Sequence, residues 1–221
     1  MIRHIPHDGT IIPSKYKFIG EQISLRDKHA IEIFGQGKCL IFPIDRIICD
    51  VERFLENEPM ESVGMGVCYE KNANLEPMRC VSTEEREEII STYYIPHHKL
   101  LEDMVTEELN LYGKCLIIDC HTYRKEPWPY EDSSKTRPQI DIGFNKNSHT
   151  VNQITNMLSE DFSVYLNSPF SGALVPIRYM NDPRVESIML EVRQDVDVYK
   201  AKQIINEKLS VLERNFYGNQ L

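Results

Sequence analysis

The feature that most constrains the fold of this chain is an apolar run that ends at Asp-x-His. Residues 114–122 read Lys-Cys-Leu-Ile-Ile-Asp-Cys-His-Thr, which is typical of a central strand buried on both faces. Side chains alternate along a strand, so Asp119 and His121 point to the same side at its carboxyl end. Ligands bind at that edge of an open α/β sheet, and we expect a functional site there. Residues 124–138 follow directly and are expected to form a loop over this site.

Strand-like and helical segments alternate along the 221 residues. This alternation predicts an α/β fold, with a mostly parallel sheet and helices on both faces. A chain of this length needs only one core, so we expect a single domain over 1–221. The longest expected helix contains Pro96, which predicts a kink or a break there. The expected strands are 2–6, 39–42, 63–69, 115–120, 139–143, 173–177 and 187–192, and the expected helices are 26–34, 84–112, 151–158 and 198–214.

Charge and hydropathy exclude several classes of function. The net charge of -9 argues against a nucleic-acid-binding surface, which needs a basic field. No apolar run approaches the roughly 20 residues of a membrane span, and the N-terminus lacks the apolar segment of a secretory signal. The six cysteines form no Cys-x-x-Cys pair. This pattern favours reduced, buried thiols in a cytoplasmic protein over disulfides or a cysteine zinc cluster.

Histidines follow two of the expected strands, which suggests a metal site. His7 comes after the first strand and before a turn at Gly9, a place that is also typical of an exposed turn histidine. A catalytic zinc site needs three protein ligands and one open position for water. His7 and His121 would supply two of them, and the third is expected from Asp27 or His29. Residues two apart on a helix diverge, so only one of these is expected to point inward.

The last expected strand ends with a carboxylate and a guanidinium. Met189, Glu191 and Arg193 share one face of this strand. The structural interpretation is an ion pair at a sheet end. The functional interpretation makes Glu191 a general base for metal-bound water and Arg193 a clamp for a substrate carboxylate.

Two more segments place charged or titratable side chains beside apolar ones. In residues 44–53, Arg46 or Arg53 can bind a substrate carboxylate or polarise a scissile carbonyl. A surface strand with paired charges fits the same composition. His97 and His98 lie on the long expected helix, where a partly buried, hydrogen-bonded histidine is the commoner state. A role in substrate contact is kept open for His98.

Taken in order, these segments resemble the N-formylglutamate amidohydrolase family. The resemblance runs from residue 5 to residue 193 and implies a zinc-carboxypeptidase-like catalytic domain, a three-layer α/β/α sandwich around a mixed, mostly parallel sheet. Each short pattern of the family has a counterpart in this chain. Residues 6–9 with 12–13 resemble Pro-His-Ser-Gly with Ile-Pro, 26–29 resemble Arg-Asp-Thr-Asp, 45–46 resemble Ser-Arg, and 50–53 resemble Asp-x-Asn-Arg. Residues 94–98 resemble Tyr-x-Pro-Tyr-His, 119–122 resemble Asp-x-His-Ser, and 191–193 resemble Glu-x-Arg.

The resemblance also implies site residues. It makes His7 and His121 the ligands of one zinc ion and Glu191 the base that activates water. It assigns the binding of substrate charge to Arg53 and Arg193. The chain departs from the family pattern at several positions, and three of these departures matter most for the site: Asp8 replaces Ser, Lys28-His29 replaces Thr-Asp, and Glu52 replaces Asn. The second departure leaves either Asp27 or His29 as the third ligand, and Glu52 adds a negative charge near any anionic substrate.

Three functions follow from these patterns. The first is a cytoplasmic zinc-dependent amidohydrolase that cleaves the amide of a small, N-formylglutamate-like N-acyl amino acid. In it, Asp27 completes the zinc site, Arg53 stabilises the oxyanion and Arg46 braces this group. The second is a metallocarboxypeptidase-like peptidase, and the third is a binding protein that has lost catalysis, as the changes at 27–29 and Glu52 suggest. The expected partner is a small-molecule substrate, and no particular oligomeric state is indicated.

Overall fold

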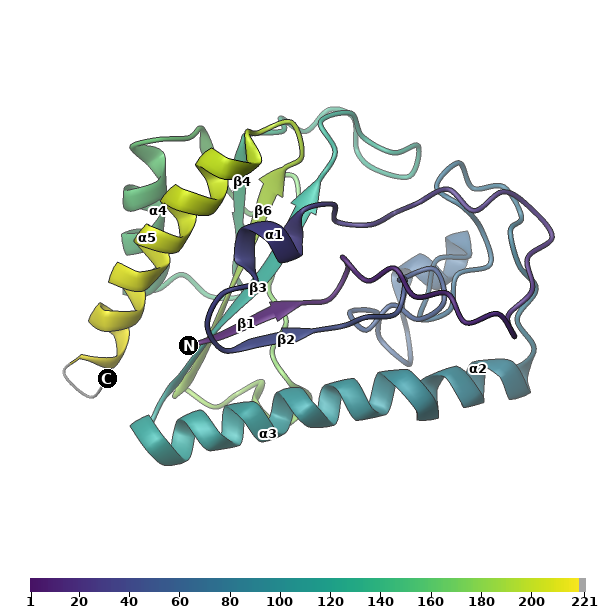
Figure 1. Cartoon of the computed structure of the whole chain (residues 1–221), viewed down its shortest axis with the longest axis horizontal. Coiled ribbons are helices and arrows are strands. Elements are labelled where there is room, and N and C mark those ends of the chain that lie inside the picture. The colour runs from purple at the N-terminus through teal and green to yellow at the C-terminus, as the bar shows by residue number, and fades with distance from the viewer. Residues whose placement is uncertain (219–221) are drawn as a thin grey trace.

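A mixed sheet of six strands runs through the computed structural model, which describes residues 1–218 (Figure 1). Its strand order is β2-β1-β3-β6-β4-β5. β2, β1, β3 and β6 are parallel to one another, whereas β4 is antiparallel to β6 and parallel to β5. The strands are β1 (Ile2–Ile5), β2 (Cys39–Ile41), β3 (Cys115–Tyr123), β4 (Ile140–Gly143), β5 (Val164–Leu166) and β6 (Val185–Arg193).

Helices cover both faces of this sheet, which confirms the predicted α/β/α class. On one face, β3 residues such as Ile118 pack with β6 against α1, α4 and α5. On the other face, Ile117 packs against Leu101 and Val105 of α3. All nine residues of β3 are buried, as expected for a central strand covered on both sides. The helices are α1 (Ala30–Phe34), α2 (Thr83–Ile89), α3 (Ile95–Tyr112), α4 (His149–Ser159) and α5 (Val198–Tyr217).

The long helix predicted over 84–112 is present without a break at Pro96. α2 continues into a π-helical segment, Ile90–Tyr94, and then into α3. Proline lacks an N–H, and its ring clashes with the carbonyl four residues back in a regular helix. The wider π-helical turn just before Pro96 accommodates this ring, so the helix changes its winding there.

Three of the predicted elements are wrong. Residues 63–69 contain Gly64 and Gly66 and form an irregular loop with one isolated bridge, Met65 to Tyr69. Residues 173–177 are not a strand, and β5 was not predicted. The first helix starts at Ala30, because His29 has a left-handed backbone with φ of 72°. Residues 26–29 are therefore a loop.

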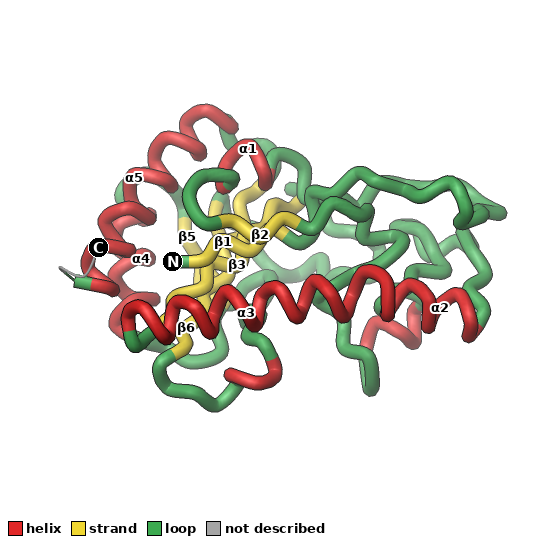
Figure 2. The backbone as a smooth tube through the Cα atoms, turned by 60° about the horizontal axis from the view of Figure 1, so that its bottom comes forward, coloured by secondary structure: helices red, strands yellow, loops and turns green. Residues whose placement is uncertain are grey.

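A second, loop-rich region extends beyond the carboxyl ends of β1 and β3 (Figure 2). It includes the 3₁₀ turn Pro59–Val63, whereas another 3₁₀ turn, Ile177–Tyr179, lies beside the sheet. Its own apolar cluster includes Phe42, Ile48, Tyr69, Met78 and Ile89. This packing fixes the path of residues 45–53, which carry several of the charged side chains singled out above. Among the described residues, none of the helices has the length and apolar character to span a bilayer.

Candidate active site

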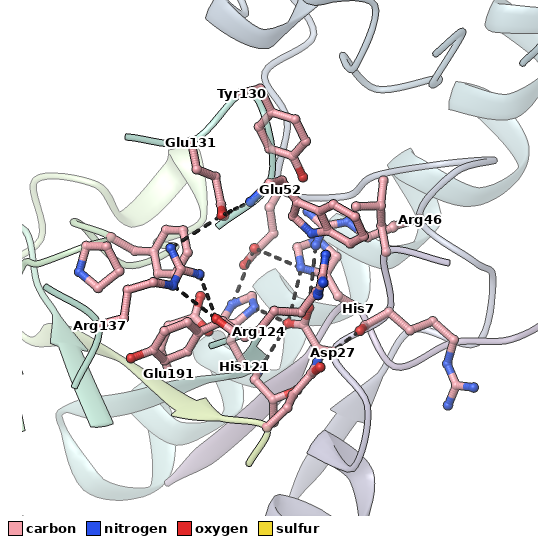
Figure 3. Close-up of a pocket in the computed structure, with 18 of the residues that line it drawn as sticks. His7, Asp27, Arg46, Glu52, His121, Arg124, Tyr130, Glu131, Arg137 and Glu191 are labelled. Carbon is pink, nitrogen blue, oxygen red and sulfur yellow. Dashed lines mark hydrogen bonds and ion pairs between the residues drawn. The ribbon is translucent and has the colours of Figure 1, made fainter. Parts of the chain in front are cut away.

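A cavity of about 790 Å³ opens where the sheet meets the loop-rich region (Figure 3). Side chains reach it from the carboxyl ends of β3 and β6, from the chain after β1, and from three loops. Its lining residues belong to the segments 23–28, 46–53, 121–137, 169–171 and 189–194, from each of which some or all side chains face the cavity. Residues 124–138 form one wall of the cavity, as a loop that follows β3.

The two strand-end histidines meet in this cavity. His7 lies two residues beyond β1, and His121 lies near the end of β3. Their ring centroids are 5.1 Å apart, and both side chains are buried. Nδ1 of His7 and Nε2 of His121 have no hydrogen-bond partner within residues 1–218.

A carboxylate stands beside both of these nitrogens. Glu52 Oε2 is 3.6 Å from His7 Nδ1 and 3.3 Å from His121 Nε2. The three side chains offer ligand atoms that all lie within 4.8 Å of one another. Two imidazoles and one carboxylate are a donor set that suits zinc, and two buried nitrogens without a partner are what a metal ion would satisfy. The residues present therefore fit a bound metal.

A second carboxylate, that of Asp27, approaches the histidines from another side. Its Oδ2 is 2.8 Å from His121 Nδ1 and 3.7 Å from His7 Nδ1. Burial raises the pKa of Asp27, but the contacts with His121 and His7 outweigh it and hold the pKa below its usual value. Asp27 is therefore an ionised partner of both imidazoles, with its closest contact to the nitrogen of His121 that does not face Glu52.

Asp50 fixes His7 from behind. Its Oδ1 is 2.8 Å from His7 Nε2, and its Oδ2 accepts hydrogen bonds from Tyr69 Oη at 2.6 Å and Arg46 Nη2 at 2.8 Å. The main-chain N–H of Glu52 also donates to Asp50 Oδ1, at 3.0 Å. Burial opposes ionisation of this carboxyl, but the nearby Arg46 and His7 hold its pKa well below the usual range. Asp50 thus orients His7 so that Nδ1 faces the cavity.

Glu191 lies beside His121 in the sheet, because the two residues are paired in the register of β3 and β6. Its side chain is buried, lines the cavity and leaves Oε2 without a partner among the described residues. Burial, helped by the negative charge of Asp27 and opposed by His121, raises the pKa of Glu191 well above its ordinary value. A buried carboxyl group with a raised pKa is suited to proton transfer.

Both predicted arginines of the 44–53 segment line the cavity. Arg46 is held by Asp50, and its Nη1 also lies 3.5 Å from Asp27 Oδ1. Arg53 Nε is 3.4 Å from Asp50 Oδ2 and has no hydrogen-bond partner in the described chain. Arg46 is therefore occupied by two carboxylates, whereas Arg53 keeps donors available.

The structure does not bring His29 or Arg193 to this group. His29 is exposed, with Nδ1 3.2 Å from Glu32, because the helix that was expected to aim it inward starts only after it. Arg193 lies outside the cavity lining and donates from Nε to Asp195 and from Nη1 to the main-chain carbonyl of Arg137, both at 2.6 Å.

His98 lies behind the cavity wall rather than in it. Its Nε2 donates to the main-chain carbonyl of Val51 at 2.7 Å. Burial lowers the pKa of His98, so the imidazole is neutral at physiological pH. Its contact supports the chain immediately before Glu52 and does not reach the cavity.

A further buried chain of polar contacts lies beneath His121, with hydrogen bonds on both sides of His4. Asp119 Oδ1 is 3.2 Å from His121 Nε2 and 2.9 Å from His4 Nδ1, and His4 Nε2 is 2.8 Å from His97 Nε2. Burial lowers the pKa of His97 to about 2. This chain connects the cavity to α3 through neutral and ionised groups that are shielded from water.

Glu52 and Arg137, which line this cavity, and Asp50, which lies behind His7, are among the residues that the sequence interpretation did not place. Glu52 was noticed only as a charge that departs from a pattern. The signal that would have found it is its position two residues after a buried aspartate, in a segment that alternates apolar and charged residues. Arg137 belongs to the 124–138 loop, whose composition carries no such periodicity.

The sequence matches the family model described as N-formylglutamate amidohydrolase over residues 1–197. The fold is similar to that of an N-formylglutamate amidohydrolase from Ralstonia eutropha, with a TM-score of 0.82 and 17% identity over 96% of this chain and 92% of that chain. It is also similar to a gene product of Agrobacterium tumefaciens, with a TM-score of 0.68 and 16% identity over 96% of this chain and 91% of that one. No match was found among curated proteins.

Proposed function

Because the chain belongs to the N-formylglutamate amidohydrolase family, and is thus an amidohydrolase, we propose that it is a zinc-dependent hydrolase of a small N-acyl amino acid such as N-formylglutamate. One observation carries this proposal. His7, His121 and Glu52 direct metal-ligating atoms toward one point of the cavity, next to a buried Glu191.

We assign the zinc ligands to His7 Nδ1, His121 Nε2 and the Glu52 carboxylate. The sequence favoured Asp27 as the third ligand, but Glu52 is the carboxylate that lies near the open nitrogen of both histidines. Asp27 then accepts from His121 Nδ1 and sets the orientation of that ring, as outer carboxylates do around zinc. A zinc ion held by these residues would lower the pKa of a bound water molecule to about 7 and would polarise the amide carbonyl.

Glu191 performs the proton transfers in this proposal. Its carboxylate takes a proton from the attacking water and gives it to the departing nitrogen of the amide. The raised pKa suits both steps, because a carboxyl group with an ordinary pKa is a poor proton donor near neutral pH. The position of Glu191 is set by the pairing of β6 with β3, so it stays close to His121.

Arg53 is the proposed partner of the negative charge that develops on the carbonyl oxygen or is carried by the substrate. Its side chain lines the cavity and keeps Nε free of a hydrogen-bond partner in the described chain. Arg46 has a bracing role, since it is paired with Asp50 and Asp27. Preorganised charge of this kind stabilises a tetrahedral transition state without reorganisation during the reaction.

The experiment is to compare the wild type with Glu191→Gln and with Glu160→Gln, an exposed glutamate paired with Lys208 on the surface. Formate release from N-formyl-L-glutamate and zinc content by elemental analysis are measured for each protein. Glu191→Gln should keep its zinc and lose roughly 10²- to 10⁴-fold in turnover, whereas Glu160→Gln should match the wild type.

Full activity in Glu191→Gln would remove this residue from the mechanism. Inertness of the wild type toward N-formyl and other N-acyl amino acids, with release of amino acids from peptides, would instead favour a carboxypeptidase-like activity. A wild type that binds zinc and hydrolyses neither N-acyl amino acids nor peptides would favour the binding-protein hypothesis.

A further inference from the structure

Arg137 has an unusual environment for a residue of a surface loop. Its side chain is only 8% exposed, although the loop of residues 124–138 carries it over the cavity. The guanidinium lies 4.9 Å from the ring centroid of Tyr123 and 5.4 Å from that of Phe170. Aromatic faces on a guanidinium fix its plane and replace part of its hydration.

The hydrogen bonds of Arg137 use only one edge of its guanidinium. Nε and Nη2 both donate to the main-chain carbonyl of Arg124, at 3.0 and 2.9 Å. Nη1 is buried and has no hydrogen-bond partner within the described residues. An arginine side chain has five N–H donors in a rigid fork, so the Nη1 edge remains for another acceptor. Leaving a buried charged donor without an acceptor is costly, so this edge calls for an acceptor such as a bound anion.

The nearest carboxylate does not satisfy this edge. Glu131 Oε2 lies 3.3 Å from Arg137 Nη1 as an ion pair, but its short hydrogen bond, at 2.7 Å, comes from the main-chain N–H of Trp128. Glu131 therefore stands next to the place where an anion would bind, while it is committed to the turn of its own loop.

The residue predicted as a carboxylate clamp, Arg193, supports Arg137 instead. Its Nη1 donates to the main-chain carbonyl of Arg137, so β6 holds the loop at this point. Arg137 and Arg46 lie on opposite sides of the group formed by His7, His121 and Glu52 (Figure 3). Arginine side chains thus flank both sides of the reacting centre.

We infer that Arg137 is a specificity-determining residue, which binds an anionic group on the substrate through its free Nη1 edge and selects N-acyl amino acids with an acidic side chain over neutral ones. This inference rests on the proposed function. A locked guanidinium suits a carboxylate because it offers two parallel donors without first losing side-chain entropy. Glu131 weakens this selection, since its negative charge competes for the same edge.

The test uses L-glutamate and L-glutamine as probes, because they differ in charge and hardly in size. Calorimetric titration gives their dissociation constants for the wild type, Arg137→Gln, Arg137→Lys and Arg184→Gln, the last being an exposed arginine paired with Asp182. The wild type should prefer glutamate, and Arg137→Gln should lose roughly 10- to 100-fold of that preference. Arg137→Lys should keep part of it, and Arg184→Gln should keep all of it.

Two further variants distinguish the role of Arg137 from that of other charged residues in the same loop. Glu131→Gln removes the competing charge and keeps an acceptor for the Trp128 N–H, so its preference for glutamate should rise severalfold. Arg124→Gln removes the other guanidinium of the loop, which stacks on Trp128 at 3.8 Å from the ring centroid. Its preference should stay within about twofold of the wild type. If Arg124→Gln loses the preference while Arg137→Gln keeps it, the proposal is overturned.

A wild type that binds both probes equally well would also overturn it, as would an unchanged preference in Arg137→Lys and Arg137→Gln alike. If Arg137→Gln does not fold, Arg137→Lys and Glu131→Gln still test the proposal. The preference for glutamate should fall in Arg137→Lys and rise in Glu131→Gln. These measurements need no turnover. Absence of N-formylglutamate hydrolysis with a glutamate preference that depends on Arg137 would therefore reject the proposed hydrolysis but still support Arg137 as the residue that binds a carboxylate in this cavity.

Discussion

His121 and Glu191 are placed by two paired strands, whereas Glu52 stands on irregular chain between β2 and α2. On the sheet side, register and alternation decide where a side chain points, and apolar contacts on both faces hold the strands. On the loop side, a buried carboxylate positions the side chains instead. Asp50 binds His7, Arg46 and Tyr69, and it accepts a hydrogen bond from the main-chain N–H of Glu52. The comparison teaches that one cavity combines side chains placed by strand pairing, those of His121 and Glu191, with a side chain, that of Glu52, on a segment held by hydrogen bonds to a buried carboxylate.

The largest effect on stability is expected from Asp50→Ala, which removes the carboxylate that holds the loop side of the site together. The variant removes the buried carboxylate that pairs with both Arg46 and Arg53, and removing one member of a buried ion pair typically destabilises by about 3–5 kcal/mol. Urea unfolding monitored by circular dichroism measures this loss. Asp182→Asn, which breaks an exposed pair with Arg184, is the control and should stay within about 0.5 kcal/mol of the wild type. Equal stability of the two variants would contradict the structural role of Asp50.

Zinc affinity sharpens the comparison between the two carboxylates. Glu52→Gln removes a proposed ligand, so its zinc dissociation constant should rise by more than about 100-fold. Asp27→Asn removes a partner of a ligand, and such changes cost roughly 10- to 100-fold. Competition with a chelator of known affinity measures both. The reverse order would make Asp27 the ligand, as the sequence first indicated, and Glu52 its neighbour.

A pH effect is expected at the buried His97, where α3 meets the sheet. The folded protein keeps this imidazole neutral until the pH falls to about 2, whereas the unfolded chain protonates it near pH 6.5. The unfolded state therefore binds more protons as the pH falls, and this group costs about 2 kcal/mol of stability between pH 7 and pH 5. His97→Gln should lose less stability over this range than the wild type or His149→Gln, an exposed control. Parallel pH profiles for all three proteins would show that His97 does not titrate on unfolding.

The smallest effect is expected on the sheet side. Ile118→Val removes one buried methylene from the cluster between β3 and α5 and should cost about 1 kcal/mol of stability. Its kcat and zinc content should remain those of the wild type, because the register of β3 and β6 does not depend on this group. A loss of zinc in Ile118→Val would show that the two regions are not held independently.

The parts of the site that depend on regular strands were accessible from the sequence. The apolar run before His121 and the alternation around Glu191 both place their side chains at the carboxyl edge of the sheet. His29 was misplaced because a helix was extended over residues 26–29, where a left-handed backbone instead delays its start. Such a local departure has no signature in hydrophobic periodicity.

Irregular chain explains the remaining gaps. Glu52 and Arg137 reach the cavity through loops whose paths are fixed by contacts with distant residues, such as His98 with Val51 and Arg193 with Arg137. The predicted strand over 63–69 failed for the same reason: its apolar residues pack into the second cluster from a loop that contains two glycines. Burial alone does not distinguish these cases, because strands and packed loops bury similar residues.

Elemental analysis of the wild type and His121→Ala, both purified without a chelator, tests the central claim most directly. The account requires a single divalent cation between His7, His121 and Glu52. It predicts about one zinc per chain in the wild type and almost none in the variant. A wild type without zinc, or a variant that retains the full amount, would contradict it.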